Sequence, residues 1–266
     1  MILTLLTDYG RDDDFVGVCH AVIAGIAPDA RIVDITHGVP RHDVRAGALV
    51  LRNTLPYVSP GVHVAIVDPQ VGTERRAVAL RTEDGRIFVG PDNGLLSLAF
   101  EKAGGVLEAV DVTRSPHRLE PVSATFHGRD VFCPVAAHLA SGDELAEAGE
   151  PLDPDELVTI ALPKPRTDGD ALVAHVLSID RFGNAALNVS HESLAGTGIV
   201  LGGQVEIRSG TEHFHAVVAQ TFADVREGDI LVYEDAYRAL SVAINRGDAA
   251  ATLQLAADTE VWITPR

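Results

Sequence analysis

The first 67 residues alternate apolar runs with amphipathic segments, and this order restricts the possible folds. Runs at 2–6, 31–35 and 62–67 have the length and apolar content of buried strands. Between them, apolar residues recur at helical spacing in two segments, one starting at Phe15 and the other capped by Asp43. Strand–helix–strand–helix–strand is typical of a mostly parallel sheet with helices on its faces, so we expect an α/β domain.

The periodicity changes in the second half of the chain. After acidic loop material, residues 163–170 are rich in proline, aspartate and glycine and are predicted to be a linker. Beyond it, apolar residues recur mainly at every second position. These features predict two domains, an α/β domain at 1–162 and a small all-β domain, a barrel or a sandwich, at 171–266. The predicted strand regions of the second domain are 173–179, 200–207, 213–222, 230–233 and 252–263.

The charge of the chain limits its partners. Its 266 residues include 38 Asp and Glu against 21 Lys and Arg, a formal net charge of −17. Such a chain does not attract nucleic acid or an anionic membrane non-specifically, so we expect neither as a partner. We find no signal-peptide pattern and no apolar run long enough to span a bilayer. Cys19 and Cys133 lie in apolar helical patterns typical of buried thiols, and we expect a soluble cytoplasmic protein.

Four loops of the first domain are dense in Gly, Asp, Asn and His: 7–10, 68–75, 91–94 and 126–130. Each is also compatible with an ordinary turn or a helix cap, because these residue types favour turns for local reasons. Loops that follow parallel strands, however, meet at one edge of the sheet, where open α/β folds bind their ligands. We therefore expect a functional site at this edge.

Asp68 is the residue on which this hypothesis depends most. The strand at 62–67 delivers it to the carboxyl end of the sheet, and a Pro/Gly turn carries the chain back to Arg75. An Asp and an Arg folded over one sheet edge can form a reaction centre. The alternative is a tight turn closed by a surface ion pair.

Five motifs occur in one order along nearly the whole chain. They are Thr7-Asp8-Tyr9-Gly10 with Asp13, Val67-Asp68-Pro69 with Val71-Gly72-Thr73 and Arg75-Arg76, Pro91-Asp92-Asn93-Gly94-Leu95, Thr125-Phe126-His127-Gly128-Arg129-Asp130, and Ile179-Asp180-Arg181-Phe182-Gly183-Asn184. With these motifs the chain resembles the S-adenosyl-L-methionine (SAM) hydroxide adenosyltransferases, also called SAM hydrolases, which are related to the SAM-dependent fluorinase and chlorinase.

The resemblance implies a reaction and its residues. A water-derived hydroxide attacks C5′ of SAM and yields adenosine and L-methionine, with Asp68, Arg75 and His127 as the catalytic set. It also implies an N-terminal α/β catalytic domain, a C-terminal β-barrel, and homotrimers with active sites between subunits. Since SAM is the substrate, we expect no cofactor, and we expect no metal.

Substrate-binding roles also follow from the resemblance. Asp8 matches a carboxylate that chelates the ribose hydroxyls, a task suited to two acceptor oxygens. The remaining residues match groups around the methionine ammonium, the adenine and C5′, although each is also compatible with a turn or a solvated charge. They are Asp13 and Asp180 at the ammonium, Phe182 and Asn184 at the adenine, and Phe126 near C5′.

The chain departs from the family pattern at three places. Gln70 stands where the family usually has glycine, so the local turn geometry is in question. Residues 233–238 replace an Asn/Ser-rich segment that usually contacts methionine and adenine, and His42 replaces an aromatic residue over the ribose.

Two alternatives stay open at the level of sequence. One is a halogenase, but fluorinases carry Tyr, Thr, Tyr and Ser where this chain has Asp68, Val71, His127 and Gly128. A carboxylate near C5′ would repel halide, and valine offers it no hydrogen bond. The other is a SAM- or adenosine-binding protein with little turnover.

Overall fold

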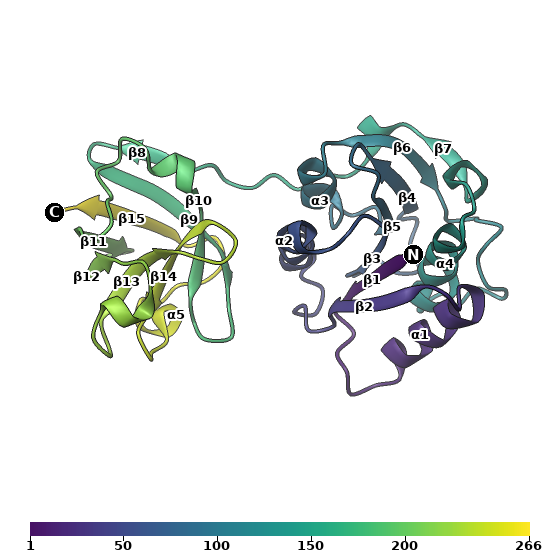
Figure 1. Ribbon diagram of the computed structural model, residues 1–266, viewed down its shortest axis with the longest axis horizontal. Coiled ribbons are helices and arrows are strands. Elements are labelled where there is room, and N and C mark those ends of the chain that lie inside the picture. Colours follow the sequence, from purple (N-terminus) through teal and green to yellow (C-terminus); the bar gives the residue numbers. More distant parts are fainter. The chain divides into compact units, whose positions relative to one another are not determined.

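The computed structural model describes all residues from Met1 to Arg266. The chain divides into two compact units, Met1–Ile160 and Ala161–Arg266, which are shown in Figure 1. Each unit has its own hydrophobic core. None of the helices has the length and apolar character needed to cross a membrane.

The N-terminal unit contains a seven-stranded sheet in the order β2-β1-β3-β5-β4-β6-β7. Its first four strands run parallel and the remaining pairings are antiparallel, so the sheet is mixed, with the α/β character that the sequence predicts. The strands are β1 (Ile2–Thr7), β2 (Arg31–Thr36), β3 (Val62–Ile66), β4 (Ala77–Thr82), β5 (Ile87–Pro91), β6 (Val106–Asp111) and β7 (Glu150–Leu152).

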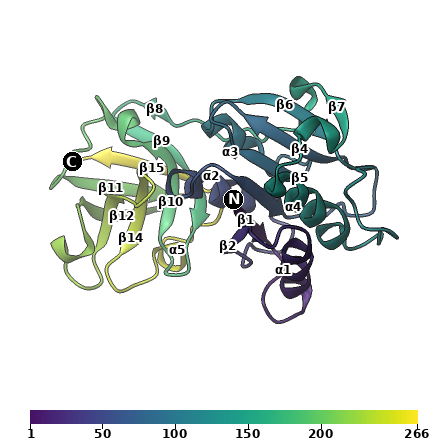
Figure 2. The same cartoon turned by 45° about the vertical axis from the view of Figure 1, so that its right-hand side comes forward.

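Helices cover both faces of this sheet. Helices α1 (Phe15–Ile26) and α4 (Cys133–Ser141) contact each other, as do α2 (Val44–Thr54) and α3 (Ser97–Lys102) (Figures 1 and 2). A π-helical turn, Gly128–Phe132, leads into α4, and short 3₁₀ turns occur at Leu55–Tyr57, Leu145–Glu147, Pro154–Glu156, His191–Leu194 and Phe222–Asp224.

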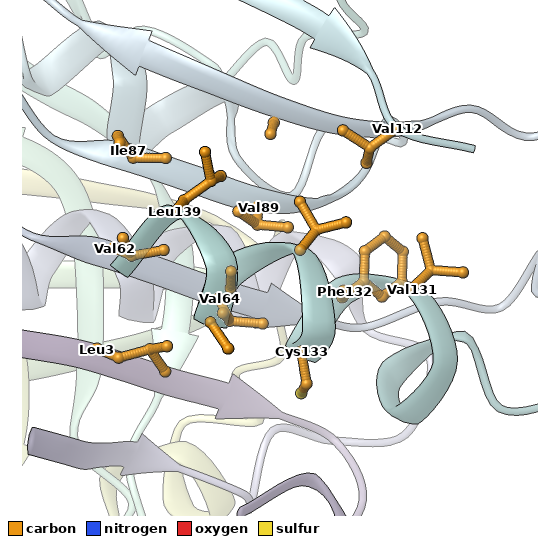
Figure 3. Close-up of a cluster of buried hydrophobic side chains, with 14 of the residues drawn as sticks. Leu3, Val62, Val64, Ile87, Val89, Val112, Val131, Phe132, Cys133 and Leu139 are labelled. Carbon is orange, nitrogen blue, oxygen red and sulfur yellow. The ribbon is translucent and has the colours of Figure 1, made fainter. Parts of the chain in front are cut away.

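Strand β3 is buried on both sides, which explains why all of its residues except His63 are apolar. Successive side chains of a strand point to opposite faces. Val62 and Val64 accordingly join the core beneath α1 and α4, whereas Ala65 joins the core beneath α2 and α3. Figure 3 shows the first of these cores, with Val64 facing Cys133 of α4. This central position fixes where β3 ends and therefore where its following loop begins.

The two cysteines are fully buried in the same core, as the sequence predicts. Cys19 lies in α1 and Cys133 in α4. A hydrogen bond with Cys19, together with burial, raises the pKa of the Cys133 thiol well above its usual value, so this thiol is protonated and unreactive at neutral pH.

The C-terminal unit is a closed β-barrel of seven strands. The strand order is β10-β14-β13-β12-β11-β15-β9, and a pairing between β9 and β10 closes the ring. An additional strand, β8, pairs with β9 outside the ring. The elements are β8 (Arg166–Asp168), β9 (Ala171–Ile179), β10 (Ala185–Ser190), β11 (Gln204–Ser209), β12 (Glu212–Val218), β13 (Ile230–Glu234), β14 (Ala239–Ile244), α5 (Ala249–Thr252) and β15 (Glu260–Pro265).

The barrel differs from its sequence-based description in four elements. Strand β8 forms inside the predicted linker, because Gly169 takes a positive φ and turns it back onto β9. Strands β10 and β14 were not predicted; β14 is buried along most of its length and lacks the period-two alternation of a half-buried strand. The run predicted at 252–263 begins as the end of α5, which Asp248 caps, and only its last part is strand.

A buried histidine makes the N-terminal unit sensitive to acid. His63 of β3 is fully buried, its Nδ1 lies 2.9 Å from the Thr4 hydroxyl, and its Nε2 has no partner. Burial, assisted by the charge of Arg86, lowers the pKa of His63 to about 4. In the unfolded chain this histidine titrates near pH 6.5. Between pH 6.5 and 4 the unfolded chain therefore binds a proton at His63 that the folded chain does not bind.

We expect the free energy of unfolding of the N-terminal unit to fall by about 3 kcal/mol through His63 alone as the pH falls from 7 to 4. The variant His63→Gln should lack this contribution, and His215→Gln, at an exposed position, should keep it. Denaturant unfolding at several pH values measures the effect. Parallel pH dependences for wild type and His63→Gln would contradict it.

Candidate active site

A cavity of about 270 Å³ opens at the carboxyl ends of β1 and β3. All of its lining residues belong to the N-terminal unit. They come from the loop after β1, the start of α1, the loop before α2, the loop after β3, and the turn that leads into α4. They are Asp8, Tyr9, Asp13, Phe15, Arg41, His42, Ile66, Asp68, Val71, Thr125, His127 and Gly128.

Asp68 and Arg75 form a buried ion pair at this cavity. Arg75 Nε donates to Asp68 Oδ1 at 3.2 Å, and Arg75 Nη2 donates to Asp68 Oδ2. The two side chains are only 6% and 3% exposed, which rules out the alternative of a surface ion pair. A two-pronged pair of this kind fixes the orientation of the carboxylate as well as its charge.

The turn between the two residues tolerates Gln70. The positive φ of this turn, +80°, falls on Gly72, where a Cβ would also approach the Ala124 carbonyl oxygen to 2.5 Å. Gln70 instead contributes its carbonyl oxygen, which accepts from the backbone N–H and the hydroxyl of Thr73. Glycine is therefore needed at 72 and not at 70.

Arg75 is held by three further contacts. Its Nη1 donates to the Arg76 carbonyl oxygen at 3.1 Å, and its guanidinium lies 5.3 Å from the centre of the Phe132 ring. Its Nη2 also lies 3.1 Å from His127 Nδ1. Phe132 and His127 both belong to the segment around the π-helical turn, an irregularity that occurs often at functional sites.

The contact with Arg75 determines the tautomer of His127. An arginine can only donate hydrogen bonds, so Nδ1 of His127 must accept, and the ring hydrogen of the neutral imidazole resides on Nε2. Burial lowers the pKa of His127, and the positive charge of Arg75 lowers it further. At neutral pH, His127 therefore offers the cavity a neutral ring that donates through Nε2.

Asp8 also lines the cavity, and hydrogen bonds with backbone groups fix its position. Its Oδ2 accepts from the His42 N–H at 2.9 Å, and its own N–H donates to the Ile66 carbonyl oxygen. His42 adopts a positive φ of 64°, which turns its N–H toward the carboxylate. Asp13 lines the same cavity from an exposed position just before α1.

Three aromatic rings pack together at the cavity wall. Tyr9, Phe15 and Phe126 have ring centres between 5.1 and 5.9 Å apart. Tyr9 and Phe15 line the cavity. Phe126, which the resemblance places near the reacting carbon, is not among the lining residues and instead packs against the Tyr9 and Phe15 rings. A Cβ at Gly128 would lie 2.3 Å from the Tyr9 hydroxyl oxygen, so glycine is required for this packing.

The loop 91–94, one of the four predicted to form the site, has a structural role instead. Asp92 accepts from Arg76 Nε and from the Val158 N–H, each at 2.9 Å. Asn93 donates through its side chain to the Val67 carbonyl oxygen. These bonds brace the end of β3 without lining the cavity.

Asp180, Phe182 and Asn184 lie together on the turn between β9 and β10 of the barrel. Asp180 Oδ1 accepts from the N–H groups of Phe182 and Asn184, and its Oδ2 accepts from the Asn184 side chain at 2.8 Å. Gly183 supplies the positive φ of the turn. Phe182 is 68% exposed, an unusual position for a large apolar ring.

The divergent segment 233–238 is a second turn of the barrel, between β13 and β14. The Asp235 carboxylate accepts from the N–H groups of Tyr237 and Ala239 and from the Ser241 hydroxyl. The Asp235 and Arg238 N–H groups also donate to carbonyl oxygens of the same turn, so its backbone donors are largely used within the chain.

Sequence reasoning gave no site role to several residues that line the cavity, among them Tyr9, Phe15, Arg41 and Ile66. Tyr9 adjoins Asp8 in the same motif, which is a usable signal. Phe15 starts the apolar pattern of α1, yet it is 40% exposed. Arg41 carries no sequence signal.

The structure contains two groups of side chains with the chemistry of metal ligands, and none of these residues lines the cavity. They are His20, Asp34 and His37, and His117, His138 and Asp143.

The protein thus consists of an α/β domain joined to a β-barrel, and the α/β domain has a cavity at its sheet edge. A buried set of carboxylate, arginine and histidine lies at this cavity, which is typical of a site for a small molecule. Residues 3–149 match the SAM hydroxide adenosyltransferase N-terminal domain, and residues 174–262 match the C-terminal domain of that family. The chain belongs to the SAM hydroxide adenosyltransferase family.

Individual relatives agree with this assignment. The chain is 45% identical to the (R)-S-adenosyl-L-methionine hydrolase of Salinispora arenicola, over 98% of this chain and 97% of the relative. It is 32% identical to a fluorinase of an Actinoplanes species, over 99% and 97% of the two chains. The crystal structure of an uncharacterized conserved protein from Thermotoga maritima superposes with a TM-score of 0.91 at 36% identity, covering 99% of this chain and 100% of that one.

We expect NMR of ring-labelled protein to show His127 as the Nε2–H tautomer, titrating below the usual histidine pKa. In Arg75→Gln the nearby positive charge is lost while Asp68 remains, so the pKa of His127 should rise. Arg166→Gln, in the barrel, is the matched control and should leave it unchanged. An Nδ1–H tautomer in the wild type would contradict the geometry.

Proposed function

We propose that this protein hydrolyses SAM to adenosine and L-methionine, with a water-derived hydroxide attacking C5′. The observation that carries the proposal is the buried Asp68–Arg75 pair, joined to His127, at the wall of a cavity in a chain of this family. In the reaction a C–O bond forms at C5′, the C5′–S bond breaks, and the sulfur keeps the electron pair as a neutral thioether. The proton of the water passes to solvent.

The chemistry needs an oriented nucleophile more than a strong acid or base. Holding water in line behind the C5′–S bond can contribute several kcal/mol, up to roughly 7–11 in favourable cases. Both oxygens of Asp68 accept from Arg75, which fixes the carboxylate in one orientation, and we assign it the role of orienting the water.

The charge that favours hydroxide comes from Arg75. His127 does not share this role, because burial and the charge of Arg75 lower its pKa and leave the ring neutral at neutral pH. His127 instead donates a hydrogen bond from Nε2 to the attacking oxygen. Such a donor stabilises a developing hydroxide without repelling Arg75.

The binding residues have complementary tasks in this scheme. Asp8 uses carboxylate oxygens to receive the ribose hydroxyls, and Asp13 faces the methionine ammonium. Asp180, Phe182 and Asn184 receive the ammonium and the adenine in a homotrimer, where the barrel of a neighbouring subunit supplies them. The 68% exposure of the Phe182 ring supports this role, because a large apolar surface remains accessible although the Arg181 guanidinium lies over the ring, 5.5 Å from its centre. We place the enzyme in the cytoplasm, with no cofactor.

The contact of Gly128 with Tyr9 favours hydrolysis over halogenation. Serine, the fluorinase residue at 128, would bring its Cβ to 2.3 Å from the Tyr9 hydroxyl oxygen. Val71 lines the cavity without a donor for halide, and Asp68 adds a carboxylate to the same wall. A halide site would therefore require Tyr9 to move.

We expect Asp68→Asn, Arg75→Lys and His127→Gln each to lower the rate of adenosine release, by about 100-fold or more for Asp68→Asn. Asp12→Asn, at an exposed carboxylate outside the cavity, is the matched control. Chromatography of adenosine and methionine measures turnover, and circular dichroism checks folding. Near-normal release by all three variants would overturn the catalytic assignment.

The same assay with excess chloride or fluoride separates the alternatives. Hydrolysis predicts adenosine as the main product at every halide concentration. A 5′-halo-adenosine as the main product would assign a halogenase, and SAM binding by calorimetry without adenosine over long incubation would assign a binding protein.

Co-expression of Asp68→Asn chains with Asp180→Ala chains tests the shared site. If one subunit supplies Asp68 and its neighbour supplies Asp180, random assembly leaves about one quarter of the sites intact. We expect mixed assemblies to recover up to about that fraction of wild-type activity, while each variant alone stays inactive. No recovery in mixed assemblies would show that each chain uses its own barrel.

A further inference from the structure

We propose that His20, Asp34 and His37 form a binding site for a divalent transition metal ion, with zinc as the best-suited ion. Two imidazoles and one carboxylate converge here from different elements: α1, β2 and the loop after β2. His20 Nε2 lies 2.8 Å and His37 Nε2 lies 3.1 Å from the same oxygen, Asp34 Oδ1. Imidazole ligands select zinc and its neighbours over magnesium and calcium.

The contact of His37 with Asp34 is the observation that points to a ligand. The His37 side chain is completely buried, and its Nε2 lies 3.1 Å from Asp34 Oδ1 without the alignment of a good hydrogen bond. A buried imidazole nitrogen whose only polar neighbour is poorly aligned is incompletely satisfied, which is costly in a native protein. A cation between His37 Nε2 and Asp34 would satisfy both groups.

The spacing of the three groups suits a metal ion. All three ligand atoms lie within 4.8 Å of one another, and a tetrahedral zinc site needs its ligands about 3.4 Å apart. His20 is partly exposed on α1, so its side chain is less constrained than that of the buried His37. With three protein ligands, a water would complete a tetrahedral zinc site.

A second layer of contacts orients His37. Its Nδ1 lies 2.9 Å from the Thr7 hydroxyl, and the hydroxyl oxygen accepts from the Tyr9 N–H. With a metal ion on Nε2, the ring hydrogen of His37 would reside on Nδ1 and be donated to this hydroxyl, as metal-binding histidines usually donate their other ring N–H. The His37 carbonyl oxygen accepts from the Gly10 N–H at 2.8 Å, so the metal site is tied to the loop that carries Asp8.

The cluster of His117, His138 and Asp143 has the same residue types but unsuitable geometry. The two imidazole rings are stacked, with centres 4.2 Å apart and planes inclined by only 17°. A bound metal lies close to the plane of each ligand ring, and nearly parallel stacked planes do not meet at such a point. His117 Nε2 is also buried without a partner, yet this cluster serves as a control and not as a site.

Zinc titration of untagged, chelator-treated protein tests the proposal by calorimetry, with magnesium as the control ion. We expect saturation at one zinc per chain, a rise in the thermal midpoint, and visible absorption bands when cobalt replaces zinc. His20→Ala and Asp34→Asn should abolish all three responses, and His138→Ala should keep them. Thr7→Val, which retains every ligand, should weaken zinc binding by about 10- to 100-fold.

Two results would overturn the proposal. One is the absence of saturable zinc uptake by folded wild-type protein. The other is uptake that His20→Ala and Asp34→Asn leave unchanged, since the zinc would then be bound elsewhere. Because His20 and Asp34 are partly exposed, both variants should fold, and circular dichroism verifies this.

Discussion

The buried ion pair of Asp68 and Arg75 is the interaction on which the rest of the site depends. Two charges at 6% and 3% exposure are stable only when each is paired and hydrogen-bonded. Arg75 meets this requirement with Asp68, the Arg76 carbonyl oxygen, the Phe132 ring and His127. Each partner is thereby fixed in place, and the cavity wall becomes rigid before any ligand binds.

The surrounding fold is arranged to deliver this pair. Strand β3 is buried on both faces, and only the buried Val67 separates its last residue from Asp68. Gly72 allows the turn to pass close to the Ala124 carbonyl oxygen, which brings the turn against the segment that leads to His127. The π-helical turn at Gly128–Phe132 then places His127 and Phe132 on two sides of the guanidinium.

The electrostatics of the pair determine what chemistry the site supports. Arg75 pairs with Asp68, and burial together with the positive charge of Arg75 lowers the pKa of His127, so the wall presents an oriented carboxylate and a neutral imidazole donor to a ligand. This suits a reaction in which a neutral group leaves a sulfonium and the protein need only position water. In the proposed enzyme, positioning of the water therefore contributes more to catalysis than electrostatic stabilisation of the hydroxide.

The sequence by itself determined the α/β start, the barrel and the motif residues, because strand periodicity and short motifs are local properties. It also identified the family, through five motifs in order. It did not reveal β10 and β14, whose short or fully buried runs carry no clear period, nor the cavity-lining Phe15 and Arg41. Only the tertiary structure decided the burial of the Asp68–Arg75 pair, the tautomer of His127 and the convergence of His20, Asp34 and His37. The physical reason is that burial and hydrogen-bond direction depend on atoms distant in sequence, such as Arg75 Nη2 and His127 Nδ1.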